Sequence, residues 1–197
     1  MINHIVISLG DILASGEYKE EKLIEAFSTF KCPLEVDLED FLVNNAIRYE
    51  KSNIGKTYLF VNEKALSKGS FVIDAYVTLA TKAVDISEMT SKGKRKMLGN
   101  YPGRDDMKTI SAFLIGQLGR SENCDKQEVS GEDLLNECYS VFKRARALVG
   151  GVVIVLDLEC REHMFDKFYA RQGFKKLRNE LNNDNLFELY KKVNFEE

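Results

Sequence analysis

The chain has 197 residues, of which 44% are apolar and 30% are charged, a composition typical of a globular domain with a sizeable core. Its formal net charge of −3 provides no general basic surface, so nucleic-acid binding would need a local cluster of lysines and arginines. The longest apolar run, residues 150–156, is too short to span a bilayer, and the first residues lack the basic segment of a signal peptide. We therefore expect one cytoplasmic domain over residues 1–197 that does not associate with membranes.

The cysteine and histidine content argues against a metalloprotein. The four cysteines show no CxxC spacing, which is typical of free thiols in a reducing compartment; they are Cys32, Cys124, Cys138 and Cys160. Only two histidines, His4 and His163, accompany them. With no cluster of His and Cys ligands, the sequence predicts no transition-metal site.

The first quarter of the chain predicts one strand and two helices. Residues 4–9 form a short apolar segment that is typical of a strand. Residues 19–27 and 38–49 carry apolar side chains at helical spacing. Asp37 stands immediately before the second helix, and we expect it to be the N-cap.

Two β-rich segments follow, over residues 57–62 and 70–80. The polar connection between them has Gly69 near its end and predicts an antiparallel hairpin. Residues 85–106 are polar and contain a basic run, which is Lys92, Lys94, Arg95 and Lys96. This run has two interpretations, a solvated surface segment or a flap that meets a negatively charged partner.

The centre of the chain predicts a strand–loop–helix–strand crossover. An apolar strand over residues 110–118 leads through a polar loop into an amphipathic helix that follows Ser130 and ends at Leu148. Ser130 and Asp133 have the spacing of a capping box. A strand over residues 151–158, apolar on both faces, comes next, as in the units that build parallel strand pairs.

The last part of the chain predicts a short helix and a hairpin. Residues 162–172 have an apolar side at helical spacing, and Gly173 ends the helix. Residues 174–178 and 186–193 are strand candidates, and the turn-rich sequence NNDN between them favours a hairpin.

Two stretches carry candidate chemistry. Backbone N–H groups of Gln127–Glu132, at the start of the central helix, could bind the pyrophosphate of a cofactor. The capping box alone also explains this stretch, and the GxGxxG motif of dinucleotide-binding proteins is absent. Tyr169 is either a core aromatic residue or a general acid. The second role is chemically reasonable because the pKa of an ordinary tyrosine, about 10, lies near that of a thiol leaving group.

These motifs occur in an order that resembles the GNAT superfamily of acetyl-CoA-dependent N-acetyltransferases. In that family a strand, a pyrophosphate loop of pattern Q/R-x-x-G-x-G/A, a helix, a strand and an F-Y-x-x-x-G-F element follow one another. Here the loop is KQEVSG, with Gly131 at the last glycine position, Lys126 in place of Gln or Arg, and Val129 in place of the first glycine. The sequence FYARQGF, residues 168–174, matches the last element at every fixed position.

The upstream half resembles one branch of this superfamily, the acetyltransferase toxins of bacterial toxin–antitoxin pairs. The segments FKCPLEVDLEDFLVNNA, KTYLFVN, AYVTLA and FLIGQLGR are similar in order and spacing to elements of those toxins. The resemblance covers residues 27–178 of the chain.

The resemblance implies a fold, a cofactor and roles for individual residues. The fold is an α/β GNAT fold, a mixed and splayed sheet of about six to seven strands with helices on both faces. The cofactor is acetyl-CoA, whose pantetheine arm would pair with backbone groups of Gln117, Leu118 and Gly119. Its pyrophosphate would lie on the loop residues, which are Lys126, Gln127, Glu128, Val129, Ser130, Gly131 and Glu132. Tyr169 would protonate the coenzyme A thiolate, and strand N–H donors would stabilise the oxyanion.

The resemblance also implies transfer of the acetyl group to a primary amine, which in the toxin branch belongs to an aminoacyl-tRNA. No carboxylate on the strand over residues 110–118 is available as a base. Three basic clusters either contact the tRNA phosphates or are solvated surface charge; they are Lys92–Lys96, then Lys143, Arg144 and Arg146, then Lys175, Lys176 and Arg178. A small antitoxin and a second copy of the chain are the expected protein partners.

Two alternatives stay open. The first is an acetyltransferase that acts on a small-molecule amine or a protein amine. The second is a binding or interaction module without catalysis, because Val129 replaces a glycine of the cofactor loop.

Overall fold

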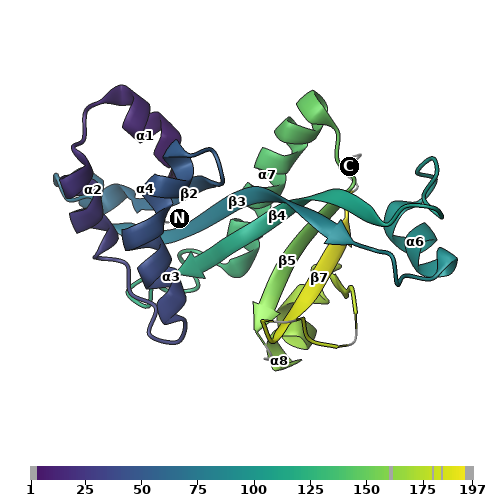
Figure 1. Ribbon diagram of the computed structural model, residues 1–197. Coiled ribbons are helices and arrows are strands. Elements are labelled where there is room, and N and C mark those ends of the chain that lie inside the picture. Colours follow the sequence, from purple (N-terminus) through teal and green to yellow (C-terminus); the bar gives the residue numbers. More distant parts are fainter. Residues whose placement is uncertain (1–3, 160–161, 179, 183, 194–197) are drawn as a thin grey trace. The chain divides into compact units, whose positions relative to one another are not determined.

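The computed structural model describes residues 4–159, 162–178, 180–182 and 184–193. They form a seven-stranded, mixed sheet of order β1-β2-β3-β4-β5-β7-β6 together with helices (Figure 1). The chain divides into two compact units, unit 1 with Met1–Ala80 and Gly116–Val141, and unit 2 with Thr81–Ile115 and Phe142–Glu197. Strands β3 and β4 and helix α7 each contribute residues to both units. The expected α/β class and strand number are confirmed, whereas the single domain over residues 1–197 stays a prediction.

The strands of unit 1 are antiparallel. β1 (His4–Ser8) pairs with β2 (Lys56–Asn62), and β2 pairs with β3 (Ile73–Asp85), so the hairpin predicted from residues 57–62 and 70–80 is confirmed. The ladder between β2 and β3 contains a bulge, because Phe60 faces Ala75 while Val61 faces Ile73. Asp74 is therefore the extra residue of the bulge. The connection includes a short helix, α5 (Glu63–Leu66), whose N-cap is Asn62.

Helices cover the core side of these strands. They are α1 (Leu9–Ser15), α2 (Glu20–Phe27), α3 (Val36–Asp40), the π-helical segment η1 (Phe41–Asn45) and α4 (Ala46–Lys51). The predicted strand over residues 4–9 ends one residue early, because the Ser8 side chain caps α1. The predicted N-cap Asp37 is wrong: the helix begins at Val36, and Asp37 lies in its first turn. Acidic residues suit that turn through the helix dipole, so Asp37 stabilises the start without capping it.

The core of unit 1 joins these helices to the sheet. Leu23, Phe27 and Leu42 from the helices pack in one buried cluster with residues of β2 and β3. Tyr76 of β3 is also buried there, and its hydroxyl donates a hydrogen bond to the carbonyl oxygen of Leu38 at 2.7 Å. Burial raises the pKa of Tyr76 far above its ordinary value, so this hydroxyl stays a hydrogen-bond donor.

Unit 2 is built on a parallel pair of strands. Phe113–Ile115 of β4 (Thr109–Arg120) pair with Ile154–Leu156 of β5 (Val153–Glu159), so the predicted crossover is confirmed. The helix between them is α7 (Gly131–Val149). Successive residues of β4 point to opposite faces of the sheet. Ala112 packs in a cluster with Ile86, Met97 and Leu98, while the Phe113 ring stacks on the Phe142 ring of α7 with 4.9 Å between the ring centroids.

The C-terminal part completes the sheet of unit 2. α8 (Glu162–Met164) continues into a π-helical segment, η2 (Phe165–Tyr169), so the predicted helix over residues 162–172 is shorter than expected. β7 (Leu186–Lys192) is antiparallel to β5 and to β6 (Lys175–Lys176), which confirms the predicted hairpin. Residues 160 and 183, which include the fourth cysteine and part of the predicted turn, lie outside the described residues.

The polar segment over residues 85–106 contains a helix that its sequence pattern did not predict, α6 (Ser91–Leu98), capped by the Thr90 side chain. Met97 and Leu98 pack into the core of unit 2. Lys94 is buried, and its Nζ donates to the carbonyl oxygens of Asp105 at 3.0 Å and Met107 at 2.6 Å. Of the two interpretations of the basic run, a solvated segment and a flap for a negative partner, neither holds for Lys94, whose side chain instead binds the loop that follows.

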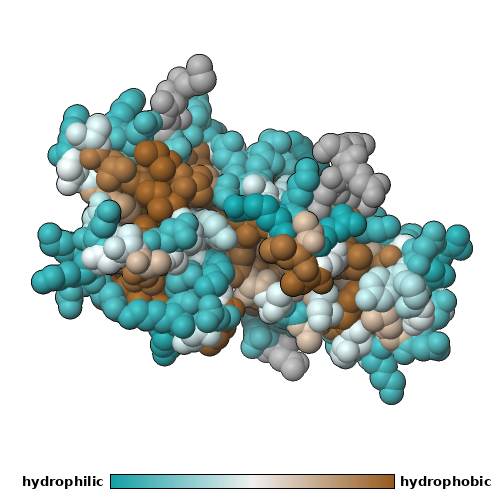
Figure 2. Space-filling model, turned by 90° about the horizontal axis from the view of Figure 1, so that it is seen from above, coloured by the Kyte–Doolittle hydropathy of each residue, from teal (hydrophilic) through white to brown (hydrophobic). Residues whose placement is uncertain are grey.

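Figure 2 shows apolar surface next to strongly polar surface on one face of the molecule. The exposed large apolar side chains of unit 1 include Ile5 and Val6 on the edge strand β1 and Leu34 before α3. No helix among the described residues is both long enough and apolar enough to cross a membrane.

We predict that Gly151→Ala destabilises the protein by about 2–4 kcal/mol. Gly151 has a φ of +131°, and a Cβ placed there would lie 2.4 Å from Cε2 of Phe113. The ring cannot yield without losing its stacking on Phe142, so overpacking adds to backbone strain. The measurement is the free energy of unfolding in urea.

Gly150→Ala is the matched control for this contact. Gly150 has a φ of +76°, but a Cβ there would meet nothing within 4 Å. The free energy of unfolding of this control should therefore fall only by the cost of backbone strain, about 1 kcal/mol. Equal losses in the two variants would show that the contact with Phe113 does not restrain Gly151.

Candidate functional site

The C-terminal end of β4 carries the three residues predicted to bind a pantetheine arm. Gln117 and Leu118 are half-buried, and Gly119 is buried against the helical side of unit 1. A Cβ on Gly119 would lie 2.6 Å from Cδ1 of Leu38, so the strand backbone approaches α3 closely. The strand is therefore held in place by unit 1 at the point where its backbone would meet a ligand.

Two backbone hydrogen bonds fix the chain where it leaves β4. The N–H of Ser121 donates to the carbonyl oxygen of Asp74 at 2.7 Å, and the N–H of Glu122 donates to that of Lys31 at 2.7 Å. Both partners belong to unit 1. The loop from Ser121 to Ser130 thus starts from a defined position.

The loop ends in the predicted capping box. The N–H of Asp133 donates to Oγ of Ser130 at 3.1 Å, and the N–H of Ser130 donates to Oδ2 of Asp133 at 2.8 Å. The Ser130 hydroxyl also donates to Oδ2 of Asp133 at 2.7 Å. This reciprocal arrangement satisfies two backbone donors at the start of α7.

Asp125 occupies most of the remaining loop amides. Its Oδ1 accepts from the N–H of Gln127 at 2.8 Å. Its carbonyl oxygen accepts from the N–H groups of Glu128 at 2.8 Å and Val129 at 3.1 Å. Together with Ser130, whose N–H donates to Asp133, four of the seven predicted pyrophosphate-binding residues use their amides inside the protein.

The first residues of α7 are the best placed anion donors of this loop. The first backbone bond of the helix runs from the N–H of Leu134 to the carbonyl oxygen of Ser130 at 3.3 Å. Gly131 and Glu132 precede that bond, so their N–H groups lie at the positive end of the helix. The carboxylates of Glu132 and Asp133 in the same turn oppose a bound anion.

Val129, which replaces a glycine of the family pattern, is part of the core at 1% exposure. Its apolar side chain explains why the loop turns inward at this point. The side chains of Lys126 and Gln127 are exposed. The loop therefore offers a lysine side chain and the two amides of Gly131 and Glu132 to a phosphate.

Tyr169 lies at the end of η2 in unit 2, whereas the loop lies in unit 1. The Tyr169 ring is buried and contacts two aromatic neighbours. Its centroid lies 5.0 Å from that of the Phe168 ring and 5.8 Å from that of the Phe174 ring. The N–H of Phe174 donates to the carbonyl oxygen of Tyr169 at 3.0 Å, which closes the FYARQGF element on itself. The ring is therefore packed in the protein, and the role of the hydroxyl as a general acid stays a prediction.

Unit 2 contains a charged network that joins three strands of the sheet. Nζ of Lys82 on β3 donates to Asp157 on β5 at 2.9 Å and to Glu188 on β7 at 3.1 Å. Burial lowers the pKa of Lys82, but the hydrogen bonds and charges of the two carboxylates outweigh it and raise the pKa. Asp157 and Glu188 therefore each form an ion pair with a charged lysine. The three residues lie far apart in the sequence, so no local sequence pattern predicts their pairing.

Unit 2 also contains a cavity lined by four lysines. This cavity of about 270 Å³ is lined by Lys96, Lys175, Lys191 and Lys192 together with Gly173 and Tyr190. Burial lowers the pKa of Lys191. The other predicted basic groups of this region are engaged elsewhere: Lys176 lies over the Phe187 ring at 3.9 Å, and Arg178 pairs with Asp85 at 3.7 Å.

Solved structures supply the comparison. No protein-family model matches the sequence, and no curated protein matches it either. A mutant of KacT in which a tyrosine is replaced by phenylalanine is 18% identical, with a TM-score of 0.68 over 96% of this chain and 94% of that one. AtaT complexed with acetyl-methionyl-tRNA is 21% identical, with a TM-score of 0.64 over 94% of each chain. AtaTR bound with acetyl-CoA is 19% identical, with a TM-score of 0.64 over 96% of this chain and 94% of that one.

This chain has the fold of the GNAT acetyltransferase toxins. The likeness extends over almost the whole length of each structure, which confirms the GNAT fold predicted from short motifs.

We predict that Ser130→Ala destabilises the protein by about 1 kcal/mol, because the N3 amide of α7 loses its capping oxygen. Ser140→Ala is the control, since Ser140 is exposed within the same helix and alanine favours helix, which predicts a small gain. Chemical denaturation monitored by circular dichroism gives both values. A loss in Ser130→Ala no greater than in Ser140→Ala would contradict the cap.

Proposed function

We propose that this protein is an acetyl-CoA-dependent N-acetyltransferase of the toxin type. The observation that carries the proposal is the GNAT fold shared with AtaT and KacT over nearly the entire chain. AtaTR has been solved with acetyl-CoA bound. In this chain the same crossover presents a strand end and a helix N-terminus, which are the two elements that such a cofactor requires.

The backbone at the end of β4 would bind the pantetheine arm as an added strand, through Gln117, Leu118 and Gly119. The pyrophosphate would meet the amides of Gly131 and Glu132 and the side chain of Lys126. Binding at Gln127–Ser130 would first require the internal hydrogen bonds to Asp125 and Asp133 to break. The predicted loop residues thus form two groups. Lys126, Gly131 and Glu132 can meet a phosphate directly, whereas the amides of Gln127–Ser130 already donate to protein oxygens.

The reaction would transfer acetyl from the thioester sulfur to an amine nitrogen. A neutral amine attacks the thioester carbonyl carbon, a C–N bond forms, and the C–S bond breaks as the tetrahedral intermediate collapses. Tyr169 would donate its hydroxyl proton to the leaving thiolate. No carboxylate occurs on β4, and Asp157 and Glu188 are engaged by Lys82, so the amine would lose its proton through water.

We propose an aminoacyl-tRNA as the source of the amine. AtaT has been solved with acetyl-methionyl-tRNA, which is the product of such a transfer. In this chain the four lysines of the unit 2 cavity, Lys96, Lys175, Lys191 and Lys192, supply clustered positive charge for a phosphate backbone. We also propose a small antitoxin as the protein partner of this chain, since AtaT has been solved with the C-terminus of the antitoxin AtaR. The homodimer and the cytoplasmic location stay predictions.

A second candidate function is a binding module without catalysis. It is favoured by the loop, where Asp125 and Asp133 carboxylates already occupy amides that would otherwise meet phosphate. Transfer to a small-molecule or protein amine remains the other alternative for the acceptor. The first experiment must therefore establish whether acetyl-CoA binds.

We predict that acetyl-CoA stabilises the protein in a thermal-shift titration, by about 2.7 kcal/mol at a concentration about 100 times Kd. Asp125→Asn should tighten binding several-fold, because the amide keeps the Oδ1 acceptor for Gln127 and removes one negative charge from the loop. Glu25→Gln removes an equal charge from the exposed surface of α2 and should leave Kd unchanged. Absence of stabilisation in every variant would favour the module without catalysis.

We predict that induced expression of the protein arrests bacterial growth and that Tyr169→Phe relieves the arrest. The variant keeps both aromatic contacts and removes the hydroxyl group that would donate the proton, so acetyl transfer in vitro should slow by about 100-fold or more. Tyr18→Phe is the control, because the Tyr18 ring contacts Phe71 at the surface of unit 1. Equal arrest by wild type and Tyr169→Phe would remove Tyr169 from the mechanism.

A further inference from the structure

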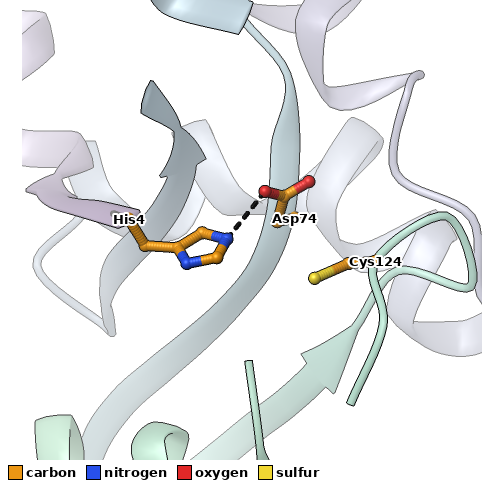
Figure 3. A group of neighbouring side chains, drawn as sticks. All are labelled: His4, Asp74 and Cys124. Atoms are coloured by element: carbon orange, nitrogen blue, oxygen red, sulfur yellow. Dashed lines mark hydrogen bonds and ion pairs between the residues drawn. The ribbon is translucent and has the colours of Figure 1, made fainter. Parts of the chain in front are cut away.

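Three metal-ligating side chains from distant parts of the sequence meet inside unit 1 (Figure 3). They are His4 on β1, Asp74 on β3 and Cys124 in the loop between β4 and α7. One ligand atom from each residue, an imidazole nitrogen, a carboxylate oxygen and Sγ, lies within 4.8 Å of the other two. Nε2 of His4 is 2.8 Å from Oδ2 of Asp74. Figure 3 shows the His4 ring and the Cys124 thiol on either side of Asp74, with the contact between His4 and Asp74 drawn as a dashed line.

The cluster is withdrawn from solvent. The side chains of His4 and Asp74 are 8% and 6% exposed, and Cys124 is 3% exposed. A buried carboxylate is costly unless it is paired, so this position restricts the side chain to hydrogen bonding or ion binding. The bulge in β3 makes Asp74 the residue that has no cross-strand partner on β2, and bulges often re-aim a side chain at a functional site.

A second layer of contacts orients the carboxylate. Nδ2 of Asn62 donates to Oδ2 of Asp74 at 2.8 Å, while Oδ1 of Asn62 accepts from the N–H of Ala65 at 2.9 Å. The amide of Asn62 is thereby fixed in orientation. Hydrogen bonds of this kind, which hold a ligating carboxylate in place, are usual around metal ions in proteins.

The donor set selects the class of ion. One nitrogen, one carboxylate oxygen and one sulfur suit Zn²⁺ and related divalent transition metals, whereas Mg²⁺ and Ca²⁺ require oxygen ligands. Two protein oxygens lie near Sγ of Cys124, the carbonyl oxygen of Asp125 at 3.6 Å and Oε2 of Glu128 at 3.8 Å. Either of them, or a water molecule, could fill a fourth position. We propose that His4, Asp74 and Cys124 bind a divalent transition metal, with Zn²⁺ as the ion that best fits this donor set.

The charges around the cluster favour a cation. The carboxylates of Asp74 and Glu128 both act on the Cys124 side chain, and Arg120 supplies an opposing positive charge. A bound divalent ion would balance the negative charge of the two carboxylates.

The metal would tie the first half of the cofactor loop to the sheet. Cys124 precedes Asp125, whose oxygens hold the amides of Gln127, Glu128 and Val129. His4 and Asp74 lie on strands β1 and β3. This consequence for the loop rests on the proposed function, whereas the metal site itself does not require that acetyl-CoA binds.

The test is metal binding by the full chain without a polyhistidine tag. Protein stripped with a chelator is titrated with Zn²⁺ in competition with a chromogenic chelator, and Co²⁺ is used as a spectroscopic substitute. We expect one equivalent of Zn²⁺ per chain and a sulfur-to-cobalt charge-transfer band in the near ultraviolet. Less than half an equivalent of bound Zn²⁺, or a Co²⁺ complex without that band, would overturn the proposal, and both measurements use the wild-type protein.

Variants assign the ligands. Cys124→Ser and His4→Gln should each weaken Zn²⁺ binding by at least about tenfold, and Cys124→Ser should abolish the charge-transfer band. Cys32→Ser is the control, because Cys32 is a more exposed thiol of the same unit and should leave affinity and spectrum unchanged. Wild-type affinity in Cys124→Ser, or loss of the band in Cys32→Ser, would contradict the assignment.

Discussion

The junction between β4 and α7 depends on how its backbone amides find acceptors. A chain that turns from a strand into a helix leaves several N–H groups without partners from secondary structure. Here Asp125 and Asp133 provide the acceptors for most of them, and Ser130 completes the cap. A phosphate bound at Gln127–Ser130 would need these same amides, so the protein's own carboxylate and carbonyl oxygens compete with an anionic cofactor for one set of donors.

Much of the fold follows from local patterns in the sequence. Alternating or continuous apolar residues located β2, β3, β4 and β5, and the Ser130–Asp133 spacing located the start of α7, because each signal lies within a few residues. The errors have a different origin. Lys94 looked like a surface residue because its acceptors, two backbone carbonyls of the loop that follows, carry no side-chain signature. Asp37 looked like a cap because acidic residues favour both the cap and the first turn.

The candidate site divides in the same way. The motif order identified the strand, the loop and the FYARQGF element, but it could not show that Asp125 holds three loop amides or that Val129 enters the core. The His4–Asp74–Cys124 cluster lay beyond sequence reasoning altogether. Its members are 70 and 50 residues apart, and only the pairing of β1, β2 and β3 brings the first two together.

The bulge in β3 has an evolutionary consequence. Phe60 and Val61 are neighbours on β2, and their partners Ala75 and Ile73 are separated on β3 by Asp74 alone. Deletion of that one codon would restore a regular ladder without moving any other strand residue to the opposite face. A lineage could therefore discard the carboxylate of the buried cluster in a single genetic step and keep its fold, so the length of β3 would record which descendants retain the cluster.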